Sequence, residues 1–391
     1  MKITGIICEY NPFHLGHKKQ FDVIRQMQGA DSGIVCLMSG SYVQRGAPAI
    51  LNKRLRAEAA IRCGADLVLE LPVTYSLRSA EGFADGGVAI LSGFCTHLCF
   101  GVETPDKEAL LSTAKALLSP SFSDALRTQL TLGLSFPAAR QAALEELGFS
   151  GNLLLQPNNI LAVEYCKAIL RQHSSLEPLP IFRDGNYHDA VPHPENPSAT
   201  ALRTCMTTGT DWQSYLPSEA TQVFEGASIH TLQAGERAIL ARLRCMTDAE
   251  FEALPFGSEG LWRKLMHAAR RESTLEQILT ATKSKRYTRT RLDRMVMCAY
   301  LGISQELLDA PAPYARVLAL NETGRSILKQ ARTTGLFPNT GAPVEHPYQQ
   351  LEHRCEDLYG LFADNTPDAP GAANTNRIFL FKKGAISYEN L

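Results

Sequence analysis

Several features of other protein classes are missing from this sequence. Its 39 lysines and arginines nearly balance 40 aspartates and glutamates, for a net charge of -1. This balance excludes the overall basic excess of a protein that coats nucleic acid, although it permits a local basic face. The N-terminal apolar stretch is interrupted by Glu9 and Asn11, too soon for a signal peptide or a membrane span. We therefore expect a cytoplasmic protein with no membrane and no DNA partner, in which any RNA contact is regional.

Cysteine pairs and internal repeats are also missing. None of the ten cysteines forms a CxxC pair, and Cys95 and Cys99 flank His97 in a run that is typical of a strand. Disulfide bonds are not expected, and buried thiols are favoured over a zinc site.

What the sequence does contain is a long alternation of strand and helix patterns. Short apolar runs predict strands at 2–10, 33–39, 66–72, 97–103 and 178–183. Strands that alternate with amphipathic helices are typical of a parallel sheet in an α/β fold. The stretch between the last two strands has a helical pattern.

The length and composition permit more than one domain, since 391 residues of which 45% are hydrophobic are ample for a large core. A loop rich in Pro, His and Asn at 187–199 is expected to end the first unit. We predict a nucleotide-binding unit at 1–208 and a mainly α-helical unit at 209–391. Within the second unit, 363–375 has the composition of a loop or a disordered segment.

The stretch YNPFHLGHKKQ at 10–20 breaks a local rule. The first turn of a helix favours Asp and Glu because the aligned peptide dipoles leave positive charge there, yet this turn carries His14, His17 and two lysines. A strand, a tight turn and a cationic helix start form a cradle for a polyanion, which we interpret as a triphosphate. Gly16 permits close approach of the backbone, and imidazoles donate hydrogen bonds and can carry charge as pyrophosphate leaves.

Two other interpretations of this histidine pair stay open. At i, i+3 spacing it supplies only two metal ligands, and no nearby carboxylate obviously completes a site. Both side chains could also be satisfied at an ordinary surface turn, because HxGH is a short pattern. The position directly after a first strand favours the phosphate interpretation.

The quoted stretches also resemble known signatures. HLGH at 14–17 resembles the HxGH motif of the nucleotidyltransferase superfamily, and SATALR at 198–203 resembles its second motif, ISSTxxR, which supplies hydroxyls and a cation to the phosphates. Most of residues 1–205 is similar to the bacterial tRNA(Met) cytidine acetate ligase family. The stretches that carry this similarity are IICEYNPFHLGH, MSGSYVQRGAPA, GADLVLELP, SAEGFADGG, FGVE, PNNILAVEY and SATALR.

The resemblance implies an α/β, Rossmann-like nucleotidyltransferase domain with a parallel sheet, followed by a mainly α-helical C-terminal domain that binds tRNA. It implies an ATP-dependent ligase that activates acetate as acetyl-AMP and releases pyrophosphate. The acetyl group would then pass to N4 of the wobble cytidine of elongator tRNA(Met), without acetyl-CoA. ATP is a substrate in this reaction, and Mg2+ is expected to assist.

Carried over by position, the resemblance implies the following site residues. The catalytic residues are His14, His17 and Arg203. The ATP loop consists of Ile7, Cys8, Glu9, Tyr10, Asn11, Pro12, Phe13, His14, Leu15, Gly16, His17, Lys18, Lys19 and Gln20. Further ATP contacts are Gly101, Asn159 (with Asn158 as the alternative), Arg183, Ser198 and Thr200.

The residue types agree with these roles but also allow simpler ones. Gly101 lies at the carboxyl end of a predicted strand, where open α/β sheets bind ligands, or is an ordinary turn glycine. Asn159 could cap the next helix, and the hydroxyls of SATALR could do the same. A guanidinium beside hydroxyls, as at Arg203, is a phosphate-binding set.

Two further groups have open roles. Gln44 and Arg45 could reach the nucleotide or the tRNA, or lie in a surface loop. Glu70 and Glu81 could hold Mg2+, but salt bridges to nearby arginines are favoured.

The stretch KSKRYTRTRLDR at 283–294 concentrates positive charge around Tyr287, as a contact with RNA phosphates and one stacked base requires. A solvated helix face is the alternative, and 262–271 extends the same surface. The candidate RNA-binding residues are Lys283, Lys285, Arg286, Arg289 and Arg291.

Two rival functions remain. One is a small-molecule adenylyltransferase or pantothenate-synthetase-like ligase without an RNA partner, against which the large basic helical half argues. The other is a non-catalytic RNA-binding protein, which the two intact motifs disfavour.

Overall fold

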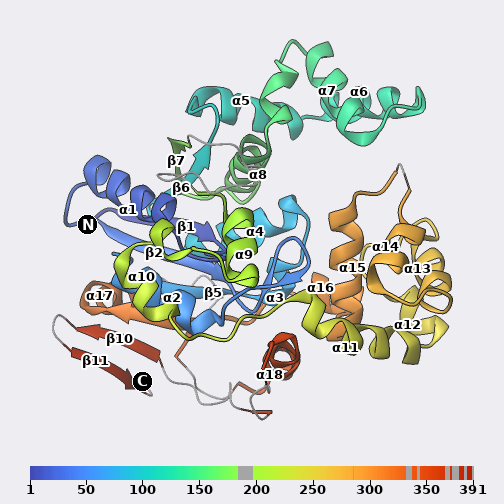
Figure 1. The fold of residues 1–391 in the computed structure, drawn as a ribbon. Coiled ribbons are helices and arrows are strands. Elements are labelled where there is room, and N and C mark those ends of the chain that lie inside the picture. Colours follow the sequence, from blue (N-terminus) through green and yellow to red (C-terminus); the bar gives the residue numbers. More distant parts are fainter. Residues whose placement is uncertain are drawn as a thin grey trace.

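A central, mostly parallel sheet organises the computed structural model, which describes residues 1–183, 197–284, 286–331, 337–340, 344–365, 370–371, 378–382 and 385–389 (Figure 1). The strand order is β11-β10-β8-β5-β2-β1-β6-β7, with β9 beside β8. Strands β3 (Tyr42–Val43) and β4 (Ala47–Pro48) form a separate antiparallel pair. The first-half strands of the large sheet are β1 (Ile3–Cys8), β2 (Gly33–Ser39), β5 (Leu67–Leu71), β6 (His97–Val102) and β7 (Glu177–Phe182). They pair in parallel, which confirms all five predicted strands.

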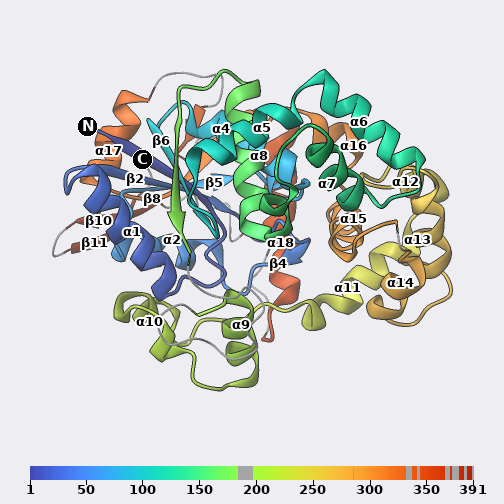
Figure 2. The same ribbon diagram turned by 90° about the horizontal axis from the view of Figure 1, so that it is seen from above.

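Helices connect and follow these strands. In the first half they are α1 (Leu15–Gln28), α2 (Lys53–Arg62), α3 (Val73–Ser76), α4 (Ala80–Leu91), α5 (Lys107–Leu117), α6 (Pro120–Thr131), α7 (Phe136–Glu146) and α8 (Pro157–Arg171). In the second half they are α9 (Ala199–Thr208), α10 (Ser218–Phe224), α11 (Leu232–Cys245), α12 (Asp248–Glu252), α13 (Leu261–Ala269), α14 (Leu275–Thr282), α15 (Arg289–Leu301), α16 (Gln305–Asp309), α17 (Glu322–Gln330) and α18 (Pro347–Tyr359). Helices α11 to α16 form a group at one side of the sheet in both views (Figure 2).

Both faces of the sheet are buried. Successive side chains of a strand point to opposite faces, so Val35 and Leu37 join the core that includes α4 and α8, whereas Ile34 and Cys36 join the core that includes α1 and α2. A parallel sheet that is covered on both faces is typical of α/β proteins. All ten cysteines are free thiols and most are buried, as predicted.

The C-terminal part returns to the sheet, which the sequence analysis did not expect. Strand β8 (Tyr314–Asn321) pairs antiparallel with β5, β9 (Phe337–Asn339) and β10 (Ile378–Lys382) pair parallel with β8, and β11 (Ala385–Glu389) completes the edge. The pattern of β8 is misleading because seven of its eight residues are buried, and a continuous apolar run cannot be distinguished from a buried helix by its period. The division at residue 208 stays a prediction.

Parts of the expected loops lie outside the described residues. These parts are 187–196 of the loop at 187–199, and 366–369 and 372–375 of the segment at 363–375. Across the ranges that the structure describes, no helix is both long and apolar enough to cross a membrane.

Candidate active site

The turn from β1 into α1 is built on its two histidines. His14 is the N-cap of α1, and its Nδ1 accepts a hydrogen bond from the backbone N–H of Gly16 (3.1 Å). Nδ1 of His17 in turn accepts from the backbone N–H of His14 (3.2 Å). This reciprocal cap explains how the helix begins without an acidic residue in its first turn.

The same contacts fix the protonation of both rings. Because each Nδ1 accepts a hydrogen bond, each neutral imidazole carries its proton on Nε2. Burial, together with the positive charge of Arg183, lowers the pKa of His14 to about 3, and burial also lowers the pKa of His17. The sequence analysis allowed for charged imidazoles, but at neutral pH these rings are uncharged donors.

One of these donors is buried without a partner. His14 is 1% exposed, and among the described residues its Nε2 has no hydrogen-bond partner. The two rings stack with their centroids 3.7 Å apart. A buried N–H with no acceptor is unfavourable unless a ligand supplies one, so this atom identifies the turn as a candidate anion site.

Arg183 and Gly101 lie beside the histidine pair. The backbone N–H of Arg183 donates to the carbonyl oxygen of Val102 (2.8 Å), and a methyl group added at Gly101 would lie 3.5 Å from Cβ and Cδ of Arg183. The charge of Arg183 lowers the pKa values of both histidines. The structure therefore brings these predicted residues together at the carboxyl edge of the sheet.

The second motif reaches the same turn from α9. Ser198 caps α9 by accepting from the N–H of Ala201 (3.1 Å). Nη2 of Arg203 donates to Oγ1 of Thr200 (3.0 Å), and Nη1 donates to the carbonyl oxygen of Asn11 (2.8 Å). Ser198 thus has the capping role, and Arg203 contacts the turn of the first motif. The residues of SATALR are therefore compatible with a phosphate-binding role.

Asn159 is buried at the start of α8, where it contacts the turn after β6. It is 1% exposed, and its Oδ1 accepts from the N–H groups of Glu103 and Thr104 (3.1 and 3.2 Å). The carboxylate of Glu103 accepts in return from the N–H groups of Asn158 and Asn159. This clamp holds the turn after β6 against the start of α8. Since the N-cap of α8 is Gln156, the capping alternative is wrong, and direct contact of Asn159 with ATP stays a prediction.

Arg56 is a site residue that sequence reasoning missed. Its side chain is fully buried, and it donates to the carbonyl oxygens of Glu9 (2.6 Å), Ser39 (3.1 Å) and Gly40. These carbonyls lie at or just after the carboxyl ends of β1 and β2, so one guanidinium fixes both strand ends and the loops that follow them. Desolvation lowers its pKa from the ordinary value. Nothing in the helical pattern of α2 distinguishes it from the arginines nearby.

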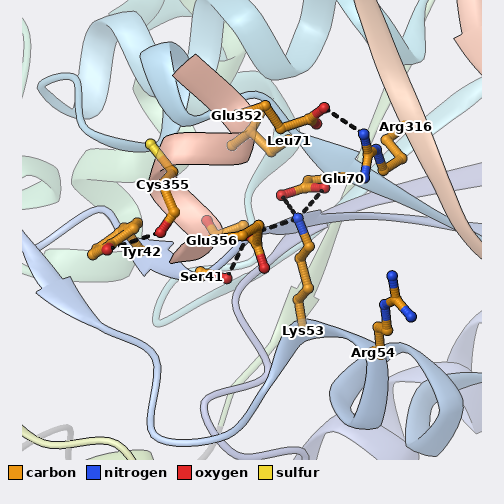
Figure 3. A network of polar contacts seen from close by, with 12 residues as sticks. Ser41, Tyr42, Lys53, Arg54, Glu70, Leu71, Arg316, Glu352, Cys355 and Glu356 are labelled. Atoms are coloured by element: carbon orange, nitrogen blue, oxygen red, sulfur yellow. Dashed lines mark hydrogen bonds and ion pairs between the residues drawn. The ribbon is translucent and has the colours of Figure 1, made fainter. Parts of the chain in front are cut away.

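A network of buried ion pairs lies next to these loops (Figure 3). Nζ of Lys53 lies 2.8 Å from a carboxylate oxygen of Glu70 and 2.8 Å from one of Glu356, and Ser41 donates to Glu356 (2.8 Å). Glu81 pairs with Lys167 and Arg171. The salt-bridge interpretation of both acidic residues is confirmed, although the partner of Glu70 is a lysine rather than an arginine.

The loop at 40–46 is held in place by its own contacts. The N–H of Gln44 donates to Oε1 of Glu9 (2.9 Å), and its side-chain amide donates to the carbonyl oxygen of Arg78 (3.2 Å). Arg45 is exposed. Gln44 thus supports the segment that enters the histidine turn.

The described residues do not form a ready-made magnesium cage. In those ranges no group of three His, Cys, Asp or Glu side chains could hold a metal ion. The side chains at the histidine turn are mainly donors and cations, and the carboxylate of Glu9 beside it accepts from the N–H of Gln44. Mg2+ usually binds through one or two carboxylates together with substrate phosphates. The donor set here fits the phosphates themselves.

The basic run at 283–294 is largely paired within the protein. Arg289 makes a bidentate contact with Glu276 (2.8 and 2.6 Å) and a further bond to Asp293 (2.9 Å). Arg291 donates to the carbonyl oxygen of Phe256, and Arg286 pairs with Glu259. Lys283 is exposed, and Lys285 lies outside the described residues. RNA binding by this run stays a prediction.

A Rossmann-like sheet with an HxGH cap after its first strand defines the nucleotidyltransferase class. In agreement, the family model HIGH Nucleotidyl Transferase matches residues 1–370. The tRNA(Met) cytidine acetate ligase of Clostridium novyi is 37% identical and covers 86% of this chain and 89% of its own; that of Acetivibrio thermocellus is 34% identical over 93% and 96%. The chain belongs to the tRNA(Met) cytidine acetate ligase family.

Solved structures agree with this assignment. Apo Thermotoga maritima TmcAL superposes with a TM-score of 0.87 at 29% identity, covering 95% of this chain and 97% of its own. The same protein bound with alpha-thio ATP superposes with a TM-score of 0.83 at the same identity and coverage.

Proposed function

We propose that the protein is an ATP-dependent tRNA(Met) cytidine acetate ligase. It activates acetate as acetyl-AMP and transfers the acetyl group to N4 of the wobble cytidine of elongator tRNA(Met). The observation that carries the proposal is the buried, unpartnered Nε2 of His14 in a turn joined to Arg203. The names of the relatives support the substrate, and the TmcAL structure with an ATP analogue supports the use of ATP.

In the first step, an oxygen of acetate attacks the α-phosphorus of ATP. The bond from that phosphorus to the bridging oxygen of the β-phosphate breaks, which gives acetyl-AMP and pyrophosphate. The reaction needs positioning and charge neutralisation rather than a covalent nucleophile. The Nε2–H groups of His14 and His17 would donate to phosphate oxygens, while Arg183 and Arg203 would offset the negative charge that develops on pyrophosphate.

In the second step, the N4 amine attacks the acetyl carbonyl carbon. The bond from that carbon to the phosphate oxygen breaks, AMP leaves, and the amine loses a proton, so that N4-acetylcytidine forms. The wobble base must leave its stack to reach the adenylate, and a closed site would shield acetyl-AMP from hydrolysis. Mg2+ would accompany ATP and neutralise its phosphates.

The fixed tautomers would allow both histidines to act as hydrogen-bond donors to phosphate. An imidazole that already carries its proton on Nε2 donates without prior protonation, so phosphate binding would not require a change of charge at neutral pH. The backbone N–H groups that fix the tautomers belong to the same turn. The turn is therefore preorganised for an anion.

The deciding experiment is transfer of labelled acetate to purified total tRNA with ATP and without acetyl-CoA, followed by nucleoside analysis. We expect ATP-dependent label in N4-acetylcytidine and its loss in His17→Ala. If acetate-dependent ATP–pyrophosphate exchange occurs but no tRNA is labelled, the acceptor is different. If neither reaction occurs, the acetate ligase proposal fails and a small-molecule adenylyltransferase takes its place.

Gly101→Ala tests the nucleotide position separately. The added methyl group would make only an ordinary contact with Arg183 at 3.5 Å, so the fold should be kept. If ATP approaches the backbone at this strand end, the same methyl group should weaken ATP binding, measured by calorimetry. Unchanged affinity would remove Gly101 from the ATP site.

A further inference from the structure

Helix α13 carries a basic face outside the 283–294 run. Its residues Leu261, Leu265 and Met266 are buried, whereas Arg263, Lys264 and the other polar residues are exposed. The exposed polar residues at or just after this helix are Arg263, Lys264, His267, Arg270 and Arg271. Positions 263 and 267 are four residues apart, so their side chains share one side of the helix. Arg270 and Arg271 directly follow its last residue, Ala269.

Most of this positive charge forms no ion pair with the residues that the structure describes. Within the described ranges, Arg263, Lys264 and Arg271 form no ion pair, and only Arg270 is paired, with Asp248 (2.6 Å). Arg263 lies over the ring of Trp262, with its Cζ 4.9 Å from the centroid. A cation stacked on an indole offers a flat, charged platform of the kind that RNA-binding proteins use for phosphates and bases.

The 283–294 run differs in this respect. Arg286, Arg289 and Arg291 are engaged with carboxylates or backbone carbonyls, and Arg289 is bound by two carboxylates at once. Arg294 is buried over the ring of Phe256. A cation that is already neutralised adds little to phosphate binding, because the favourable term is the release of counterions by unneutralised charge. The run therefore serves mainly to join α14, α15 and the loop before α13.

We propose that the outer face of α13, together with Arg271 just after the helix, contacts the phosphate backbone of the tRNA substrate. This inference rests on the proposed function, and it replaces the 283–294 run as the main electrostatic contact. The argument is charge complementarity: cations that form no ion pair with any described residue gather on and just after one helix of a chain whose net charge is only -1. In this proposal Arg289 and Arg291 stabilise the packing of the helical group α11 to α16 and do not contact tRNA.

The test is the salt dependence of tRNA binding by Lys264→Gln/Arg271→Gln. Removing two phosphate contacts should make the slope of log K against log salt less steep by roughly 1.4 to 1.8, and weaken binding at low salt. The matched control is Arg325→Gln/Lys329→Gln, which removes the same charge from α17, on the opposite side of the molecule in both views (Figures 1 and 2). The control should keep the wild-type slope.

Two further variants sharpen the result. The charge-conserving Lys264→Arg/Arg271→Lys should bind with the wild-type slope, which a packing defect would not allow. Arg289→Gln/Arg291→Gln should lower the melting temperature while the folded fraction keeps the wild-type slope. If the slope changes in this pair and not in the α13 pair, the 283–294 run is the contact and the inference is wrong.

The inference and the proposed function fail in different ways. If wild-type protein labels no tRNA with acetate, the proposed function fails. If wild-type protein labels tRNA, but the α13 pair binds it with the wild-type affinity and slope, only the assignment of α13 is overturned.

Discussion

Nη1 of Arg203 donates a hydrogen bond of 2.8 Å to the carbonyl oxygen of Asn11, across 192 positions of sequence. The side chain of Asn11 also accepts from the N–H of Ile50 (2.7 Å). The turn before His14 is therefore held from α9 on one side and from the segment before α2 on the other. A guanidinium that fixes this turn while lying among hydroxyls can order the cradle and neutralise an anion in it.

Replacing Arg203 should impair adenylation more than folding. Arg203→Ala removes both the bond to Asn11 and a positive charge, so acetate-dependent ATP–pyrophosphate exchange should fall by about 100-fold, the usual effect of losing one preorganised electrostatic contact. Thr207→Ala is the matched control, because among the described residues the Thr207 hydroxyl bonds to the carbonyls of Arg203 and Thr204 in its own helix. A wild-type exchange rate in Arg203→Ala would exclude a catalytic role for this arginine.

The pKa of His14 predicts how stability depends on pH. This pKa is about 3 in the folded protein and 6.5 in an ordinary environment, so between these values the unfolded chain binds more protons. The contribution of His14 to the free energy of unfolding is therefore complete above pH 6.5 and decreases as the pH falls. At pH 5 it is smaller by about 2 kcal/mol. His14→Gln should reduce the difference between urea unfolding free energies at pH 7 and pH 5. An identical difference in wild type and variant would contradict the buried, neutral state.

The sequence predicted the features that depend on neighbouring residues. The five parallel strands of the first half follow from their apolar runs, and α1, which follows the first of them, begins where HLGH places it. Long-range relationships were not predictable in the same way. The burial of Arg56, and the capture of Arg289 by Glu276 from another helix, depend on which segments meet in three dimensions. A run of positively charged residues has the same sequence pattern whether its side chains form ion pairs in the folded protein or are exposed to solvent.

The buried network around Lys53 predicts a large loss of stability. Lys53 is 2% exposed and lies between the carboxylates of Glu70 and Glu356. Lys53→Met leaves two buried carboxylates without their shared cation, which should lower the unfolding free energy by about 3–5 kcal/mol. Arg127→Ala is the control, since its contact with Asp124 is highly exposed and should change stability by less than about 0.5 kcal/mol. Similar losses in urea titrations of both variants would contradict a tightly coupled network.

Two glycines with similar positive φ angles allow the contact between the loop at 40–46 and α15 to be tested. Gly46 has φ +78° and Gly133 has φ +84°, so alanine at either position adopts a left-handed conformation at a cost of about 1 kcal/mol. A methyl group at Gly46 would also lie 2.4 Å from the backbone nitrogen of Arg294 in α15, whereas nothing lies within 4 Å of one at Gly133.

Gly46→Ala should therefore lower the unfolding free energy by clearly more than Gly133→Ala. It should also slow acetate-dependent ATP–pyrophosphate exchange, because the same loop carries Gln44, whose N–H donates to Glu9 beside the histidine turn. Gly133→Ala, in the exposed turn between α6 and α7, should leave the exchange rate unchanged. Equal stability losses in the two variants would mean that the loop does not press against α15. Unequal losses with wild-type exchange would mean that this contact supports the fold without positioning the cradle.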